Sequence, residues 1–235
     1  MKRGMLAAAL VAVVTSAAGA QVQEKRFSVT TRLGALAPER SSSLDPAGLV
    51  GLDTEYAFNK WFGLGAAVDV ARGNTRGEDF VARIRRGNAA AGGGDTIFYQ
   101  YVSQPVNTIN LGAFGLLRYP GSRFSPFVMG GVGNYTLLLD TQVAGRALRK
   151  NALSYTAGAG FWLRLTERSG LQFDVRSLTL QKYERAFLDP TRGRSPNTVF
   201  PEDFPLVPAA KKTAQNTMFT IGFRYIPGAS ASGSN

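Results

Sequence analysis

The chain has 235 residues, among them 27 Lys and Arg, 16 Asp and Glu, no cysteine and no histidine. Without cysteine it has no disulfide, thiol chemistry or thiolate metal site, and without histidine it lacks the commonest general base and metal ligand. The formal net charge of +11 favours anionic partners. The basic residues are scattered and form no run interleaved with aromatics, so we expect no nucleic acid among those partners.

The first 20 residues have the pattern of a secretory signal peptide. Lys2 and Arg3 precede an apolar run over residues 5–14, and the small residues 18–20 follow it. The run is shorter than the roughly 20 apolar residues of a membrane-spanning helix. We therefore expect an exported protein in which residues 1–20 are the signal peptide, residues 21–227 form one β-barrel domain, and residues 228–235 are a disordered Gly- and Ser-rich tail.

Alternation of apolar and polar residues with a period of two recurs eight times. Each segment is close to the roughly 9 to 11 residues that a tilted transmembrane strand needs. No later stretch has the roughly 18 apolar residues of a spanning helix, so this chain would span a membrane with strands. The expected strands cover residues 26–36, 48–58, 61–72, 106–119, 126–141, 152–165, 171–183 and 216–226.

The connections between these segments alternate in length. Tight turns rich in turn-forming residues follow the second, fourth and sixth segments, at residues 59–60, 120–123 and 166–170. Longer connections follow the other segments, the largest at residues 73–105 and 184–215. Outer-membrane barrels show this asymmetry, with short periplasmic turns and long extracellular loops. The even number of strands places both ends of the barrel domain in the periplasm.

The two largest connections carry patterns of their own. Residues 73–105 contain a Gly-rich tip followed by an apolar and aromatic stretch at 96–101, which predicts a hairpin that extends the third and fourth strands beyond the membrane. The prolines of residues 184–215 exclude regular sheet or helix there. Four apolar side chains predict that this loop folds over the barrel mouth as a plug or a binding surface: Phe187, Phe200, Phe204 and Leu206.

The alternation separates a nearly charge-free apolar face from a polar, Gly-rich face. In the fifth segment we assign four residues to the apolar face: Phe127, Met129, Tyr135 and Leu137. Alternation alone fits a membrane barrel whose apolar face is outside and equally a soluble barrel whose apolar face is the core.

Three features favour the membrane barrel. The polar face combines acids, bases and many glycines, which suits a narrow eight-stranded interior. The strands hold almost no Lys, whereas soluble surfaces are rich in Lys and Glu. Aromatic residues gather beside the short turns, as an interfacial girdle requires: Phe58, Trp61, Phe62, Tyr119, Phe124, Phe127, Phe173, Phe223 and Tyr225.

Charged residues of the polar face are the candidate site residues. We expect a salt-bridge network inside the barrel, because an unpaired charge shut in there costs several kcal/mol. An ion pathway or a catalytic carboxylate pair would use the same groups. The candidates are Arg32, Asp53, Glu55, Asp69, Arg118, Arg164, Asp174, Arg176 and Arg224. In an external loop, Arg83, Arg85 and Arg86 form a basic cluster that either contacts lipopolysaccharide phosphate or is a solvated loop face.

The mature chain resembles the small OmpA-like and OmpW-like outer-membrane barrels. The resemblance rests on the signal peptide, the eight alternating segments, the asymmetric connections and the closing strand at residues 219–225, which carries alternating aromatics. It implies an outer-membrane location and recognition by the barrel-assembly machinery. The chain differs from the family pattern after the closing strand, where Ile226, Pro227 and a polar tail follow. The resemblance implies no functional site.

The sequence thus predicts an all-β protein, an eight-stranded antiparallel up-and-down transmembrane β-barrel, monomeric, without enzymatic activity, metal or cofactor. Its expected role is envelope structure or surface interaction, with outer-membrane lipid and lipopolysaccharide as partners. Two alternatives stay open: a narrow pore or transporter for small or apolar solutes, and a soluble periplasmic barrel that binds an apolar ligand in its core. Histidine-dependent hydrolysis is excluded by composition.

Overall fold

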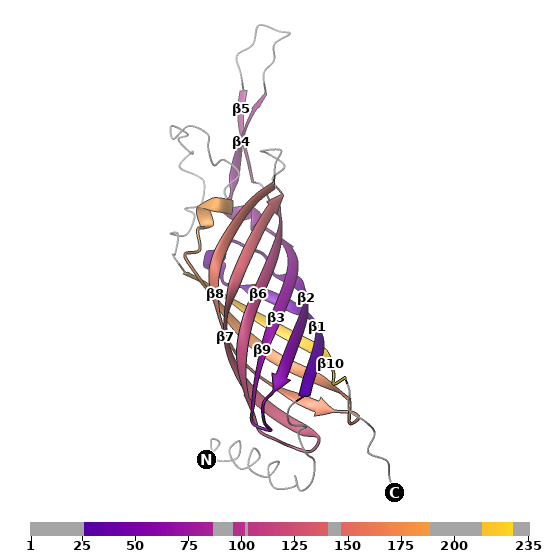
Figure 1. Cartoon of the computed structure of the whole chain (residues 1–235). Helices are drawn as coiled ribbons and strands as arrows, with labels where there is room; N and C mark the ends of the chain where they lie inside the picture. Colours follow the sequence, from indigo (N-terminus) through magenta and orange to yellow (C-terminus); the bar gives the residue numbers. More distant parts are fainter. Residues whose placement is uncertain (1–25, 87–95, 102, 141–146, 189–212, 228–235) are drawn as a thin grey trace, which may run out of the picture.

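A computed structural model describes residues 26–86, 96–101, 103–140, 147–188 and 213–227. Eight strands form a closed barrel (Figure 1). The predicted signal peptide (1–20) and tail (228–235) lie outside the described residues. The barrel strands are β1 (Arg26–Pro38), β2 (Ala47–Ala57), β3 (Phe62–Asn74), β6 (Pro105–Arg118), β7 (Phe124–Asp140), β8 (Ala147–Arg164), β9 (Ser169–Gln181) and β10 (Thr213–Tyr225).

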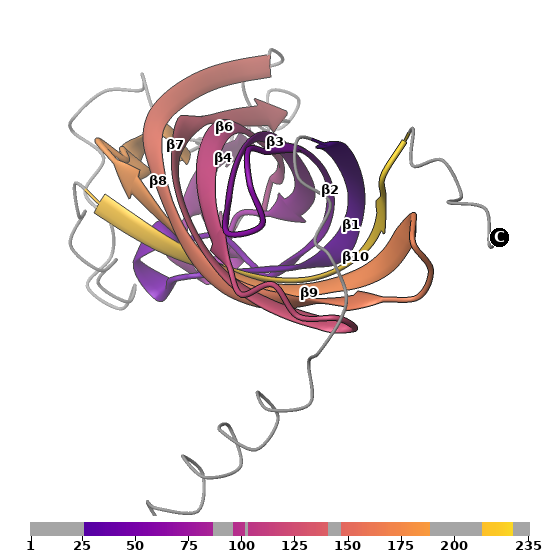
Figure 2. The same ribbon diagram turned by 60° about the horizontal axis from the view of Figure 1, so that its bottom comes forward.

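All neighbouring strands of the barrel are antiparallel. Their order around the ring is β1, β10, β9, β8, β7, β6, β3 and β2, and the ring is visible end-on in Figure 2. The first and last strands close it, with Val29 opposite Tyr225 and Pro38 opposite Asn216. This closure leaves no free sheet edge in the barrel. The predicted eight-stranded up-and-down fold is confirmed.

Short turns join the strands at one end of the barrel, which we call the turn end. In the β2–β3 turn, the Asn59 Oδ1 accepts hydrogen bonds from the backbone N–H groups of Trp61 and Phe62, both at 2.8 Å. In the β8–β9 turn, the Thr166 Oγ1 accepts from the N–H of Ser169 at 3.0 Å. Asn and Thr side chains replace backbone acceptors in this way, which fixes tight turns between paired strands.

The opposite end, which we call the loop end, carries the other described elements. They are the 3₁₀ turns η1 (Arg40–Ser42), η2 (Gly77–Asp79) and η3 (Arg185–Leu188), and the strands β4 (Val81–Arg86) and β5 (Thr96–Tyr101). The predicted hairpin is present, but β4 and β5 form a sheet of their own rather than continuing β3 and β6, and the hairpin stands beyond the barrel in Figure 1. The 3₁₀ turn η3 lies in a loop where we expected no regular structure.

The two faces of the barrel wall differ sharply in chemistry. Leu33, Val50 and Leu111 point outward and are more than half exposed, whereas Arg32 and Arg176 point inward and are each 1% exposed. An apolar exterior around a charged interior contradicts the soluble alternative, in which the apolar face would be the core. Among the described residues, no helix is long and apolar enough to cross a membrane.

The assignment of faces in β7 was wrong. Phe127, Met129, Tyr135 and Leu137 are buried inside the barrel, at 1 to 7% exposure, while Val128 and Val132 of the other parity are about half exposed. The pattern of this strand fits either assignment of its faces. It contains the glycines at positions 130, 131 and 133, and it has apolar residues at both odd and even positions. The other seven barrel strands have the predicted faces.

The interior is also less polar than the alternation predicts. Near the loop end, residues from all eight barrel strands and from the loop-end segments form one buried apolar cluster that contains Leu139, Leu178, Leu180, Phe187 and Leu188. The charged side chains lie below it, toward the turn end. An eight-stranded barrel is narrow enough for side chains to fill it, so here the loop-end half is filled as a soluble core would be.

Candidate functional site: the charged interior

Arg32 of β1 is the centre of the interior network. Its Nη2 lies 2.7 Å from Asp53 Oδ1 on β2 and 2.5 Å from Asp69 Oδ1 on β3. All three side chains are 5% exposed or less. One guanidinium therefore binds carboxylates of two strands, and because β1 and β3 are not neighbours, the contact with Asp69 reaches over β2 inside the barrel.

Arg176 of β9 completes this cluster from the other side. Its Nη2 lies 2.6 Å from Asp53 Oδ2, and its Nε lies 2.8 Å from Asp174 Oδ1 on the same strand. Strands β10 and β1 separate β9 from β2 along the wall, so the Arg176–Asp53 ion pair crosses the lumen. The upper cluster, defined as Arg32, Asp53, Asp69, Asp174 and Arg176, thus holds three carboxylates and two guanidinium groups.

Neutral polar side chains extend the upper cluster to two further strands. Asn110 Nδ2 of β6 donates to Asp69 Oδ2 at 3.3 Å, and the Ser154 hydroxyl of β8 donates to Asn110 Oδ1 at 2.8 Å. Gln172 Nε2 donates to Asp174 Oδ2 at 3.1 Å. A continuous chain of polar contacts therefore links β9, β2, β1, β3, β6 and β8 across the interior.

Gly51 of β2 makes room for the upper cluster. Its neighbours across the sheet are Arg32 and Asp69. A Cβ at this position would lie 2.6 Å from Asp69 Oδ1 and 2.9 Å from Arg32 Nη2, closer than carbon atoms approach such groups. The glycine therefore leaves room for the ion pair, and it is one of the interior glycines that the sequence pattern assigns to a narrow barrel.

A second group of charges, the lower triad, lies nearer the turn end. Glu55 of β2 binds two arginines, Arg118 of β6 through Nη2 and Arg224 of β10 through Nη2 at 2.9 Å. All three side chains are 6% exposed or less. Because β3 separates β2 from β6 and β1 separates β2 from β10, this triad also crosses the lumen.

Trp162 of β8 lies beside the lower triad. It is 3% exposed, and the Arg224 guanidinium lies 4.8 Å from the centroid of its rings. Arg164, the remaining residue of the predicted network, lies at the end of β8, with its guanidinium 5.3 Å from the same centroid. The sequence reasoning missed Trp162, although the parity of β8 would have placed it inside.

The charges of the upper cluster and the lower triad balance. Four carboxylates, Asp53, Glu55, Asp69 and Asp174, are joined to four guanidinium groups, those of Arg32, Arg118, Arg176 and Arg224. The chain has no histidine to move protons at neutral pH. Among the described residues, no group of His, Cys, Asp or Glu has a metal-binding arrangement. Mutual neutralisation of buried charges is the chemistry that this arrangement supports.

At the loop end, chain segments outside the wall cover the apolar cluster. Phe187 and Leu188 of η3 are buried in it. The Tyr183 hydroxyl, just after β9, donates to the carbonyl of Ser42 in η1 at 2.8 Å, and Gln104 Nε2 donates to the carbonyl of Leu188 at 3.4 Å. Of the residues expected to form a plug, Phe187 therefore lies over the mouth, and Phe200, Phe204 and Leu206 lie outside the described residues.

The predicted basic cluster is part of the β4–β5 hairpin. Arg83, Arg85 and Arg86 belong to β4, and the sheet register sets Arg83 opposite Tyr99 and Arg85 opposite Ile97. The three residues therefore belong to the separate β4–β5 sheet and not to the barrel that holds the interior network.

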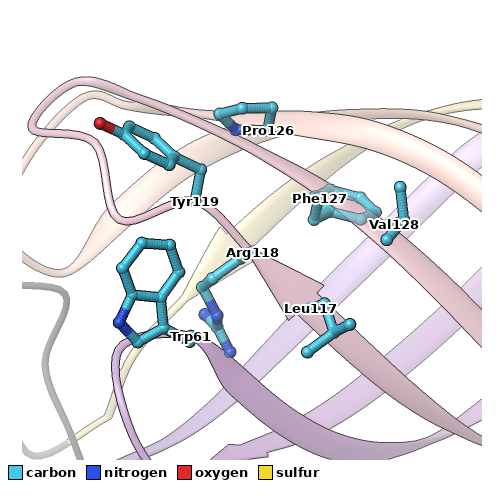
Figure 3. Close-up of a pocket in the computed structure, with 7 residues that line it drawn as sticks. All are labelled: Trp61, Leu117, Arg118, Tyr119, Pro126, Phe127 and Val128. Carbon is cyan, nitrogen blue, oxygen red and sulfur yellow. The ribbon is translucent and has the colours of Figure 1, made fainter. Parts of the chain in front are cut away.

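The outer surface near the turn end has an aromatic rim. Trp61 and Tyr119 make an edge-to-face contact with centroids 5.8 Å apart, and Phe124 and Phe161 lie 5.0 Å apart. A groove of about 390 Å³ runs between Trp61, Tyr119 and Pro126, with Leu117 and Val128 on its walls (Figure 3). Aromatic girdles mark the level at which a membrane barrel meets the lipid headgroups. Phe127, expected in this rim, instead lies inside the barrel.

A closed antiparallel barrel with an apolar exterior, an aromatic rim and a charged interior is the architecture of an outer-membrane β-barrel. The chain belongs to the family described as the outer membrane protein beta-barrel domain, whose model matches residues 6–226. No curated protein sequence matches the chain.

Three solved structures illustrate the likeness. The Neisserial surface protein A (NspA) is 13% identical, with a TM-score of 0.53 over 85% of this chain and 96% of that chain. OprG from Pseudomonas aeruginosa is 12% identical, with a TM-score of 0.47 over 88% and 99%. Ail of Yersinia pestis, in complex with the heparin analogue sucrose octasulfate, is 11% identical, with a TM-score of 0.46 over 86% and 100%. At 13% identity the likeness to NspA shows the fold alone.

Proposed function

We propose that this protein is a non-conducting, non-enzymatic barrel of the outer membrane, with a structural role in the envelope and a surface-interaction role carried by its β4–β5 hairpin. The observation that carries the proposal is the interior network. Ion pairs between strands that are not neighbours, such as Arg176–Asp53 and Arg118–Glu55, place paired charges across the lumen. The buried apolar cluster adds a second barrier to ions at the loop end.

The same proposal assigns the hairpin a partner. Arg83, Arg85 and Arg86 bring three positive charges to one short strand that stands beyond the barrel at the loop end (Figure 1). If the turn end is periplasmic, this hairpin lies at the level of lipopolysaccharide, whose phosphates guanidinium groups bind well. We therefore propose that the hairpin contacts anionic lipopolysaccharide. This contact requires only one copy of the chain, so the proposed state is a monomer.

Conductance tests the structural half of the proposal. The purified protein is added to planar bilayers, and the current is compared with that of an Asp53→Ala/Asp174→Ala variant, which removes two carboxylates of the upper cluster. We expect no unitary current from the unchanged protein. Openings from the variant would show that the upper cluster is the main barrier, and a closed variant would assign the seal to the apolar cluster. A steady unitary conductance in the unchanged protein would show that the network is a pathway and not a seal.

Binding to vesicles tests the surface half. Vesicles with lipopolysaccharide are compared with vesicles whose lipopolysaccharide has been dephosphorylated. The variant Arg83→Gln/Arg85→Gln/Arg86→Gln is expected to lose the phosphate-dependent part of binding, while Arg149→Gln, an exposed arginine at the loop end of β8, is expected to keep it. An equal loss of phosphate-dependent binding in both variants would show that the binding depends on net charge and not on the hairpin.

A transporter for apolar solutes is the second candidate, and the apolar loop-end interior favours it. The cavity between Leu36, Leu44 and Val106 of this cluster has a volume of about 10 Å³, room for about one water molecule, so an apolar solute would enter only by displacing side chains of the cluster. Fluorescence of 1-aminoanthracene measures whether this region takes up an apolar molecule. Saturable binding that a Val106→Trp variant abolishes would support transport. A signal that rises linearly with dye concentration would show partition into lipid only, and the structural role would remain as the proposed function.

A further inference from the structure

The lower triad carries one positive charge more than its carboxylate can neutralise. Glu55 is its one acid, and it binds both Arg118 and Arg224. In the upper cluster the imbalance has the opposite sign, with Asp53, Asp69 and Asp174 around two arginines. The charges of the two groups together therefore sum to zero but are polarised, with the positive excess toward the turn end.

Three buried donors of the lower triad and its neighbour have no acceptor. They are Arg118 Nε, Arg224 Nε and Trp162 Nε1, and none has a hydrogen-bond partner among the described residues. The exposures of these residues are 5, 4 and 3%. A buried N–H without an acceptor costs free energy, and it costs more when the group is charged. Water or an anion could accept these hydrogen bonds, and the excess positive charge favours an anion.

The same three residues line one cavity. Arg118, Trp162 and Arg224 enclose it together with Ser28, which supplies a hydroxyl, and Arg26 and Ile226 lie at its turn-end side. Its volume of about 10 Å³ has room for one sphere close to the size of a water molecule. That size excludes sulfate, phosphate and carboxylate ligands and leaves a monatomic anion.

Arg32 shows why unpartnered donors alone do not define such a site. Its Nε and Nη1 also have no partner among the described residues. Its surroundings, however, hold more carboxylates than guanidinium groups, so an anion there would add to an excess of negative charge. Only the lower triad combines free donors, a cavity and positive charge within the described interior.

We propose that the cavity between Arg118, Trp162 and Arg224 binds one halide ion, chloride under physiological conditions. The ion neutralises the excess charge of the triad and accepts hydrogen bonds from the buried N–H groups. It thereby ties β6, β8 and β10 together at the turn end, where Glu55 ties β2 to β6 and β10.

Tryptophan fluorescence reports on this site directly. The chain has two tryptophans, and Trp61 lies on the outer rim, so the Trp61→Phe variant in detergent micelles leaves Trp162 as the sole emitter. Bromide, a heavy-atom quencher, is titrated against gluconate at constant ionic strength. We expect quenching that saturates at one site and that chloride reverses by competition. Linear, collisional quenching or none would overturn the proposal and leave the cavity to water.

Two further substitutions in the Trp61→Phe background locate the ion. Arg224→Gln makes the triad neutral and is expected to abolish the saturable quenching. Arg32→Gln, the matched control in the upper cluster, removes a buried arginine of the same kind and is expected to keep it. Saturable quenching that persists in Arg224→Gln would overturn the assignment of the site.

Anomalous scattering gives a readout that needs no variant. Crystals of the unchanged protein grown with bromide are expected to show one strong anomalous peak within hydrogen-bond distance of Trp162 Nε1 and Arg224 Nε. Bromide peaks confined to the outer surface would overturn the proposal even if the fluorescence variants failed to fold.

Discussion

Arg176 on β9 and Asp53 on β2 meet across the barrel lumen, with the Nη2 and Oδ2 atoms 2.6 Å apart. Asp53 also binds Arg32, through its other carboxylate oxygen, at 2.7 Å. One carboxylate thus neutralises two guanidinium groups that belong to different strands. This arrangement makes Asp53 the residue on which the upper cluster depends.

Asp53→Asn is therefore expected to lower the free energy of unfolding by about 3–5 kcal/mol, because it leaves two buried arginines without their shared charge partner. Urea unfolding of the protein in lipid vesicles measures this. The control is Glu78→Gln at the loop end, which removes an exposed ion pair with Arg40 and is expected to cost less than about 1 kcal/mol. Equal effects of the two substitutions would contradict the central position of Asp53.

Leu52 lies in the middle of β2 and points outward, with 42% exposure. Leu52→Arg would place a charge in the apolar band and is expected to destabilise the barrel by about 2–4 kcal/mol. Leu165, 55% exposed at the β8–β9 turn, gives the matched position at the rim, where arginine is expected to cost about 0–1 kcal/mol. The shift between heated and unheated bands in gel electrophoresis shows whether each variant still folds, and urea titration in vesicles gives the magnitudes.

The faces of β7 can be tested by single-cysteine labelling, because the chain has no cysteine of its own. A spin label at Val128→Cys or Val132→Cys is expected to show high accessibility to dissolved oxygen, since both side chains point into lipid. A label at Met129→Cys is expected to be shielded inside the barrel. Electron paramagnetic resonance in vesicles gives the three values, and the reverse order would restore the assignment made from the sequence.

Burial raises the pKa of the Tyr183 hydroxyl far above its ordinary value of 10.0, and the neighbouring Tyr135 adds to the effect. Tyr183 follows β9 and lies over the barrel mouth, outside the strands. Because the folded state keeps a proton that the unfolded state loses, the stability it contributes is full below about pH 10 and falls as the pH rises further. Unfolding titrations from about pH 9 to about pH 12 measure the decline.

The Tyr183→Phe variant separates this effect from general alkaline unfolding. It loses the hydrogen bond to the Ser42 carbonyl, so its stability at neutral pH is expected to fall by about 1 kcal/mol. Its decline above pH 10 should be shallower than that of the unchanged protein. An identical slope in both proteins would show that Tyr183 does not contribute to the pH dependence.

The amino-acid pattern predicts the strand number, the antiparallel order, the end that carries the short turns and, in seven of the eight barrel strands, the face that meets lipid. These features follow from local chemistry, because a lipid-facing strand must alternate with a period of two and a tight turn needs residues such as Asn59 and Thr166. Which charges meet depends on how the closed barrel brings distant strands together. Arg176 and Asp53 are 123 residues apart in sequence, and their contact depends on barrel closure and on the space that Gly51 leaves beside Arg32 and Asp69.

The face of β7 that points inward also depends on the closed barrel. Phe127, Met129 and Leu137 are as apolar as the lipid-facing residues, and they fill an interior that alternation alone describes as polar. A side chain's polarity predicts the solvent it tolerates, whereas the partners it meets inside a closed barrel depend on strands that are distant along the chain.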